Sequence, residues 1–157
     1  MKRIMLIAFT IMIAFILTML PLPVWAQWIR PAWVPLVVLY WAFVLPNRVG
    51  LILAWFSGLM LDVVNGTILG EHALALSILI YCALKWHLQM RVSPLIQQSI
   101  TIGVFMLAYQ VVIFLIQGVT GNKILAWQFW LLPLLTIVYW PWLYVILQNY
   151  RQRYKLS

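Results

Sequence analysis

The amino-acid sequence predicts an all-α, polytopic integral membrane protein with about six transmembrane helices, organised as a single domain over residues 1–157. Of the 157 residues, 66% are hydrophobic and only 8% are charged. A soluble domain of this size could not cover so much apolar surface with polar side chains. The apolar stretches follow one another along the chain, separated by short segments rich in proline, glycine, asparagine or basic residues. Neither a sequence repeat nor a low-complexity linker divides the chain further.

The first predicted helix covers residues 4–20, an uninterrupted apolar stretch that follows Lys2 and Arg3. A basic start, an apolar run and a small residue such as Ala26 are also features of a secretory signal peptide. However, this run is longer than the usual apolar segment of a signal peptide, and Trp25 is unfavourable beside a cleavage site. We therefore expect the first helix to be retained.

The second and third predicted helices, residues 34–45 and 49–64, are short. Twelve helical residues span only about 18 Å, whereas the hydrocarbon core of a bilayer is about 30 Å thick. We therefore expect the second helix to begin near Arg30 and Pro31, because proline fits the first turn of a helix.

Longer helices are predicted over residues 71–89, 94–119 and 124–150, with a turn at 118–123 between the last two. The last of these helices contains Pro133 and Pro141. A proline inside a helix removes a backbone hydrogen bond, so we expect kinks at both positions.

Basic residues outnumber acidic residues ten to two, which gives a formal net charge of +8. They stand singly or in small groups between apolar stretches, unlike a surface that follows nucleic-acid phosphates, so no nucleic-acid partner is predicted. Six spans place Arg30 and Lys123 on one side of the membrane and the other basic residues on the side of both termini. The positive-inside rule then predicts cytoplasmic termini in a multi-pass inner-membrane protein. The residues on the side of the termini are Lys2, Arg3, Arg48, Lys85, Arg91, Arg151, Arg153 and Lys155.

Asp62 is the most informative polar residue in the sequence. It lies thirteen residues after Val49, which places it about 20 Å into the membrane, near the carboxyl end of a helix whose dipole disfavours negative charge. One interpretation is a coordinating, proton-handling or partner-recognising acid. The other is an ion pair or turn anchor with Arg30, His72 or the backbone of residues 65–67. We favour the second, because buried charges are normally paired.

Glu71 and His72 open the predicted fourth helix, where an acidic residue is favoured by the helix dipole and can bond free amide groups. Asp62, Glu71 and His72 could together ligate a metal, but with no second histidine nearby the signal is weak, and no metal or cofactor is predicted. Only two acidic side chains are present, and nucleophile, phosphate-loop and metalloprotease motifs are missing from the sequence. Enzymatic activity is therefore not predicted.

Three glycines fall within or after the predicted third helix. Gly58, beside Ser57, is predicted to let two helices approach closely, as small residues do in membranes. Gly66 and Gly70 are predicted to provide turn conformations that other residues adopt poorly.

Short motifs occur in a defined order along most of the chain: Arg30-Pro31-Ala32-Trp33, Leu36-Val37, Tyr40-Trp41, Pro46-Asn47-Arg48-Val49-Gly50, Gly58-Leu59, Asp62, Gly66, Leu69-Gly70, Ala73-Leu74 and Trp140-Pro141-Trp142. The order of these motifs, together with the chain length and the number of predicted spans, resembles that of the rod shape-determining protein MreD family. The candidate structural or partner-binding residues are Arg30, Pro31, Trp33, Arg48, Gly58, Asp62, Gly66, Gly70, His72, Trp140, Pro141 and Trp142.

The resemblance implies a non-enzymatic scaffold subunit of the rod complex, which supports lateral peptidoglycan synthesis, cell-wall elongation and rod cell shape. It implies four partners: MreC, MreB, RodA and a penicillin-binding transpeptidase. It also implies a fold similar to the S components of energy-coupling-factor transporters. The alternative is a small-molecule-binding membrane subunit or transporter of S-component type, which Asp62 and the short helix ends near residues 65–70 would suit. A closed polar cavity between the helices would favour this alternative, and a solid core would favour the scaffold.

The division of basic residues generates a testable topology. A reporter fused after Ser157 is expected to be active only if it functions in the cytoplasm, because eight of the ten basic residues share the side of the termini. Paired fusions of a cytoplasm-active and a periplasm-active reporter measure this directly. Activity of the periplasmic reporter alone would contradict the six-helix topology.

Overall fold

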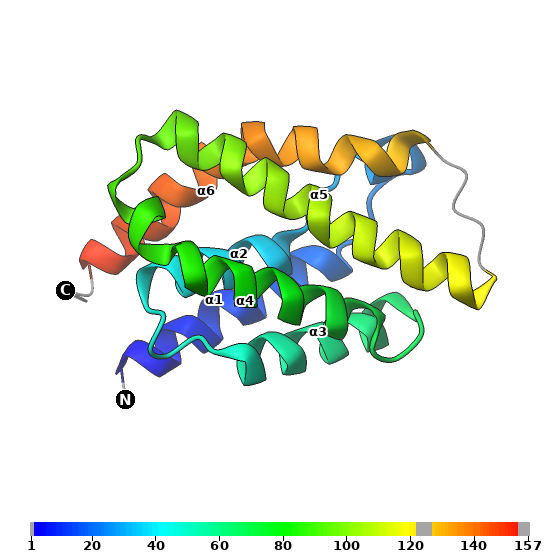
Figure 1. Ribbon diagram of the computed structural model, residues 1–157, viewed down its shortest axis with the longest axis horizontal. Helices are drawn as coiled ribbons and strands as arrows, with labels where there is room; N and C mark the ends of the chain where they lie inside the picture. The colour runs from blue at the N-terminus through cyan, green and yellow to red at the C-terminus, as the bar shows by residue number, and fades with distance from the viewer. Residues whose placement is uncertain (1, 122–126, 154–157) are drawn as a thin grey trace.

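The computed structural model describes residues 2–121 and 127–153, and this part of the chain is helical, without strands. The elements in chain order are α1 (Lys2–Met19), the 3-10 helix η1 (Val24–Ile29), α2 (Trp33–Val44), α3 (Leu51–Asn65), α4 (Glu71–Val92), α5 (Leu95–Thr120), the 3-10 helix η2 (Trp127–Trp130) and α6 (Leu131–Arg153). The predicted all-α fold is confirmed (Figure 1).

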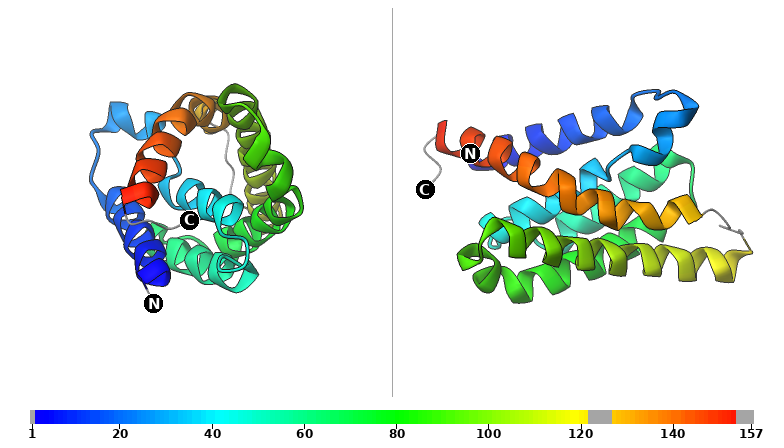
Figure 2. Two further views of the ribbon diagram at one scale, coloured as in Figure 1. Left: turned by 90° about the vertical axis from the view of Figure 1, so that its left-hand side faces the viewer. Right: turned by 90° about the horizontal axis from the view of Figure 1, so that it is seen from above.

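The six α-helices run back and forth along the bundle, so that the two ends of the chain lie at the same end of the molecule (Figure 1). This is the arrangement that an even number of spans requires. The connection between α2 and α3 and the carboxyl ends of α4 and α6 lie at the end that holds the termini, whereas η1 lies at the opposite end (Figures 1 and 2). By the bounds of these elements, Arg48, Arg91 and Arg151 belong to the first end and Arg30 to the second. Lys123 and Lys155, which also enter the predicted charge division, lie outside the described residues.

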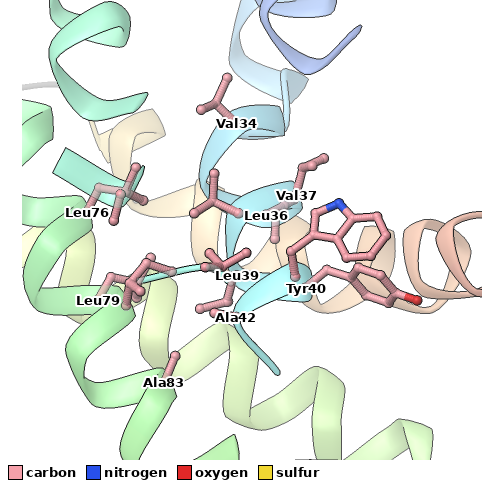
Figure 3. Close-up of a cluster of buried hydrophobic side chains, with 14 of the residues drawn as sticks. Val34, Leu36, Val37, Leu39, Tyr40, Ala42, Leu76, Leu79 and Ala83 are labelled. Carbon is pink, nitrogen blue, oxygen red and sulfur yellow. The ribbon is translucent and has the colours of Figure 1, made fainter. Parts of the chain in front are cut away.

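Helix α2 forms the centre of the bundle. It packs against α1, α3 and α4, and seen along the bundle the other helices surround it (Figure 2). Every residue from Val34 to Val44 is buried, as expected for a helix that is apolar on all sides. In Figure 3 the side chain of Leu39 extends toward Leu79 of α4.

The polar atom of Trp41, a fully buried side chain of α2, is satisfied within this packing. The indole nitrogen of Trp41 in α2 donates to the hydroxyl oxygen of Thr10 in α1 at 2.8 Å, and that hydroxyl donates to the Ile7 carbonyl at 2.9 Å. A buried donor without an acceptor would be costly. This chain of hydrogen bonds therefore fixes α1 against the central helix.

The predicted start of α2 near Arg30 and Pro31 is wrong. Arg30 is extended, with φ −67° and ψ 118°, because a residue that precedes proline is disfavoured in the helical region. The helix begins at Trp33 instead, and Pro35 occupies its first turn. A helix of only 12 residues is tolerated because it is covered by other helices and need not match the thickness of the lipid.

Helix α6 differs from its predicted form at its start. It begins at Leu131, after η2, while the expected start at residue 124 lies outside the described residues. Pro133 is the third residue of α6, where its missing N–H has no helical acceptor, so the predicted disruption there is wrong. Pro141 lies within the helix, as predicted.

By length and composition, α4, α5 and α6 could each cross a membrane. The apolar helices α2 and α3 and the segment Ile4–Met19 of α1 are shorter. Large apolar side chains are exposed on the outer helices, among them Ile52 at 76%, Ile96 at 77% and Val119 at 89%. Six apolar helices with such an exterior suit a polytopic membrane protein.

The most extensive helix contact is between α3 and α4, and Gly58 makes it possible. A Cβ atom at Gly58 would lie 2.3 Å from the Cα of Ala73 and 2.8 Å from the carbonyl oxygen of His72. Both are backbone atoms, which cannot move without displacing α4. The predicted role of Gly58 in close helix packing is confirmed.

Replacing Gly58 by alanine is expected to separate α3 from α4 and to lower the free energy of unfolding by about 1–3 kcal/mol, the cost of overpacking. Gly118→Ala in α5 is the matched control, because a Cβ there would meet nothing within 4 Å. Detergent unfolding titrations of the purified variants measure both. Equal stability of the two variants would contradict the close contact.

Candidate functional site

The polar centre of the structure is the turn between α3 and α4, and Asp62 organises it. Asp62 lies in the last turn of α3 and is fully buried. The helix ends at Gly66, whose φ of 65° is left-handed. The Thr67 amide then donates to the Asp62 carbonyl at 3.0 Å, and the Gly66 amide donates to the Val63 carbonyl at 3.4 Å. These two hydrogen bonds form a Schellman motif, which ends the helix and turns the chain back toward α4.

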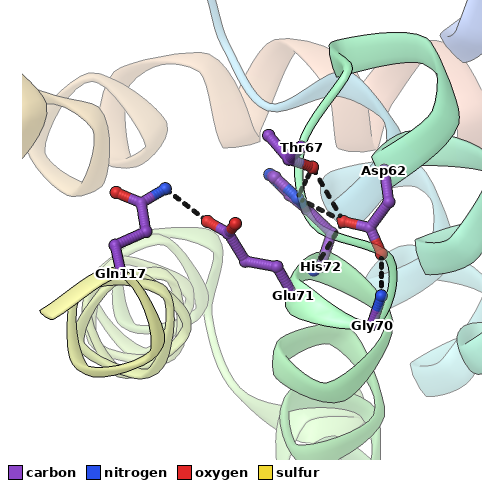
Figure 4. A network of polar contacts seen from close by, with 6 residues as sticks. All are labelled: Asp62, Thr67, Gly70, Glu71, His72 and Gln117. Carbon is purple, nitrogen blue, oxygen red and sulfur yellow. Dashed lines mark hydrogen bonds and ion pairs between the residues drawn. The ribbon is translucent and has the colours of Figure 1, made fainter. Parts of the chain in front are cut away.

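The Asp62 carboxylate accepts four hydrogen bonds from the residues that follow this turn (Figure 4). Its Oδ2 accepts the Gly70 amide at 2.8 Å. Its Oδ1 accepts the His72 amide at 2.8 Å, the Thr67 hydroxyl at 3.0 Å and the His72 ring at Nδ1 at 2.8 Å. The carboxylate therefore joins the end of α3 to the beginning of α4.

The electrostatics of this arrangement explain why a buried acid is tolerated here. The carboxyl end of α3 disfavours negative charge, but the carboxylate lies at the amino end of α4, where free amides and the helix dipole favour it. The Gly70 and His72 amides belong to that end. Gly70 has φ 104°, a conformation that is strained for residues with a side chain. The turn roles predicted for Gly66 and Gly70 are thus confirmed.

His72 is the side-chain neighbour of Asp62 at the beginning of α4. Its Nδ1 forms an ion pair with Asp62 Oδ1 when the ring is protonated, and it lies 3.3 Å from the Thr67 hydroxyl. The ring centroid is 6.2 Å from that of Tyr109 in α5. His72 was among the predicted partners of Asp62. Arg30, the other side chain considered, is not one, because its Nη2 donates to the Leu17 carbonyl at 3.1 Å.

Glu71 departs from its predicted role. It is 2% exposed and accepts a hydrogen bond from the side-chain amide of Gln117 in α5, instead of capping the free amides of α4. Figure 4 shows its side chain directed away from Asp62 and toward Gln117. Asp62, Glu71 and His72 therefore do not converge on one point. Within the described residues, no group of three or more histidine, cysteine, aspartate or glutamate side chains could hold a metal ion.

The remaining candidate residues lie elsewhere. Gly58 adjoins the network through Ala73, while Pro31 and Trp33 lie at the start of α2 and Arg48 lies between α2 and α3. In α6, Trp140 is 1% exposed and its ring centroid is 6.5 Å from that of Tyr40, whereas Trp142 is 74% exposed. The candidates therefore form one connected cluster, Asp62, Gly66, Gly70, His72 and Gly58, and several separate positions.

Comparison with known proteins assigns the chain to a family. A family model described as "rod shape-determining protein MreD" matches residues 1–150. The chain belongs to the MreD family. A rod shape-determining protein MreD from Haemophilus influenzae is 35% identical over 144 residues, which cover 92% of this chain and 89% of the relative. The chain therefore has a role in cell shape, within a family of shape-determining structural proteins.

No solved structure matches the chain. The implied similarity of this MreD-family member to the S components of energy-coupling-factor transporters thus stays an expectation from sequence resemblance.

Asp62→Ala is expected to lower the free energy of unfolding by about 3–5 kcal/mol, because all the hydrogen-bond donors that surround the buried carboxylate would lose their acceptor. Asp62→Asn should lower it less, since its amide oxygen can still accept some of these bonds. Asn65→Ala, an exposed substitution in the same turn, is the control and should stay within about 0.5 kcal/mol of the wild type. Detergent unfolding and the amount of protein in the membrane are measured.

Two outcomes would contradict this account. Normal accumulation and rod shape with Asp62→Ala would show that the carboxylate is not needed for the fold. Normal accumulation and partner binding with Asp62→Asn, together with loss of rod shape, would show a chemical role for the acid.

Proposed function

We propose that this chain is a non-enzymatic subunit of the rod complex in the bacterial inner membrane, with both termini in the cytoplasm. In this proposal it supports lateral peptidoglycan synthesis by binding partner membrane proteins through its helices. The partners are MreC, MreB, RodA and a penicillin-binding transpeptidase. Membership of the MreD family and the apolar, short-looped architecture support this function.

One feature carries the binding part of the proposal, an apolar groove of about 740 Å³ between α1 and α6, with α2 at its base. We call it the α1–α6 groove. Its walls include Ile13 and Leu17 from α1 and Trp142 and Ile146 from α6, and Val37 of α2 lies beneath them. Figure 2 shows the two helices diverging from the end that holds the termini. A groove between two spanning helices suits a third helix packed by shape, since lipid supplies no hydrophobic force for association.

MreC is the partner that we place in this groove. Among the partners that the family resemblance implies, MreC is bitopic, and a bitopic protein has a single spanning helix to insert. Along α2 the core of the bundle is filled, which favours this scaffold function over a small-molecule binder with a closed central cavity. Helix α2, with Val34 to Val44 all buried, occupies the space where a central ligand would lie.

Filling the groove is expected to release MreC. The double variant Ile13→Trp/Ile146→Trp adds bulk to both walls, and partner recovery should fall about tenfold, equivalent to about 1.4 kcal/mol of binding. Ile16→Trp/Val145→Trp is the matched control, because these residues lie on the same helices, are also exposed and do not line the groove. Partners that co-purify from detergent are quantified by mass spectrometry.

Retention of MreC by the filled groove, at the level of the control, would contradict its placement there. Loss of MreC from both variants at normal expression would assign the binding surface to a wider part of α1 and α6.

A further inference from the structure

A second cavity lies at the end of the bundle that holds the termini, far from the α3–α4 turn. It has a volume of about 260 Å³ and lies between α2, α4, α5 and α6. Its lining differs from that of the α1–α6 groove, because it contains two guanidinium groups as well as aromatic rings. We call it the arginine pocket. Its principal lining residues are Arg91, Arg151, Gln98, Tyr40, Tyr144 and Trp140.

The two arginines hold their positive charges without an acidic side chain nearby. The chain has only two acidic residues, Asp62 and Glu71, and both are engaged at the opposite end of the bundle. Arg91 donates from Nη2 to the Val44 carbonyl at 2.6 Å, and among the described residues it forms no salt bridge with an acidic side chain. Arg151, in the last turn of α6, lines the same pocket as Tyr40 of α2.

A further donor in the pocket wall has no acceptor. Trp140 is 1% exposed, and its indole nitrogen forms no hydrogen bond in the part of the chain that the structure describes. The side-chain nitrogen of Gln98 is already used by the carbonyls of Met90 and Ser93, at 2.8 and 3.0 Å. The pocket therefore combines two cations with a buried N–H group that lacks a partner.

A purely structural explanation accounts for part of this pattern. Basic residues are favoured in the last turn of a helix, and both Arg91 and Arg151 occupy such positions. That preference is met equally by the exposed Arg153. It does not explain why two arginines from different helices line one cavity together with an unpaired indole N–H.

We propose that the arginine pocket binds a phosphate group. Guanidinium groups bind phosphate oxygens through paired, charge-assisted hydrogen bonds, and basic pockets between membrane helices are known to hold anionic lipid headgroups. The phosphate comes either from the headgroup of an anionic lipid at the membrane surface or from a phosphate-bearing solute. This site is separate from the α1–α6 groove, because Trp140, Tyr144 and Arg151 face the pocket while Trp142 and Ile146 of the same helix line the groove.

The test uses the full chain purified in detergent, and the probes are phosphatidylglycerol, phosphatidylcholine and inorganic phosphate. Lipid retained after delipidation is measured by native mass spectrometry, and the thermal midpoint is measured with phosphate against chloride at equal ionic strength. Arg151→Gln removes a pocket charge, and Arg153→Gln removes the same charge from the exposed side of the same helix. Trp140→Phe removes the indole N–H together with one of the two fused rings of a side chain that is 1% exposed.

Wild type and Arg153→Gln are expected to retain phosphatidylglycerol over phosphatidylcholine, and Arg151→Gln should bind it about tenfold more weakly. Trp140→Phe should also weaken binding, and because the smaller ring leaves a cavity it should lower the thermal midpoint of the lipid-free protein as well. Retained phosphatidylglycerol that inorganic phosphate does not displace identifies the lipid as the source. A rise in thermal midpoint with inorganic phosphate alone identifies a solute.

The proposal is overturned if Arg151→Gln and Arg153→Gln reduce phosphatidylglycerol retention equally, since that would show only general surface attraction. It is also overturned if neither probe binds the wild type. If Trp140→Phe binds phosphatidylglycerol as tightly as wild type, the indole N–H takes no part in the site. If it binds as weakly as Arg151→Gln, the indole N–H contributes to binding.

Discussion

The fold depends on one buried carboxylate, that of Asp62, which joins two helices and is shielded from solvent. Asp62 accepts bonds from the Gly70 and His72 amides, the Thr67 hydroxyl and the His72 ring. In an apolar environment each of these donors would be costly if left unpaired. The acid therefore sets the length and path of the turn. It also sets the register in which α3 meets α4, where Gly58 brings the two backbones together.

From this pair, packing extends to the rest of the bundle. Helix α4 contacts both α2 and α5, so the position of α4 fixes the central helix on one side and, through Glu71 and Gln117, the end of α5 on the other. The outer helices then present apolar side chains to lipid. The two ends of the bundle differ in their charged side chains, since the acidic residues Asp62 and Glu71 lie at one end while Arg91 and Arg151 lie at the other. Both proposed binding regions, the α1–α6 groove and the arginine pocket, are lined by α6.

Features governed by local rules could be predicted from the sequence, and features that depend on distant contacts could not. Six helices, the glycine turn and the pairing of Asp62 with His72 follow from composition, spacing and the cost of buried charge. The Glu71–Gln117 contact joins residues 46 positions apart, and a glutamine in an apolar stretch gives no sign of its partner. The close contact at Gly103, where a Cβ would lie 2.6 Å from the Ile137 side chain, was not predicted either, because it also depends on a residue distant in the sequence. The start of α2 was misplaced because hydrophobic thickness was applied to a helix that is covered by protein.

Amide hydrogen exchange in lipid bilayers tests the central claim most directly. In the wild type, the Gly70 and His72 amides are expected to exchange slowly, because the Asp62 carboxylate accepts both at 2.8 Å. In Asp62→Ala these two amides should exchange faster while amides in the middle of α5 remain protected. Unchanged exchange at Gly70 and His72 in Asp62→Ala would contradict the account, because the carboxylate would then not be what holds the beginning of α4.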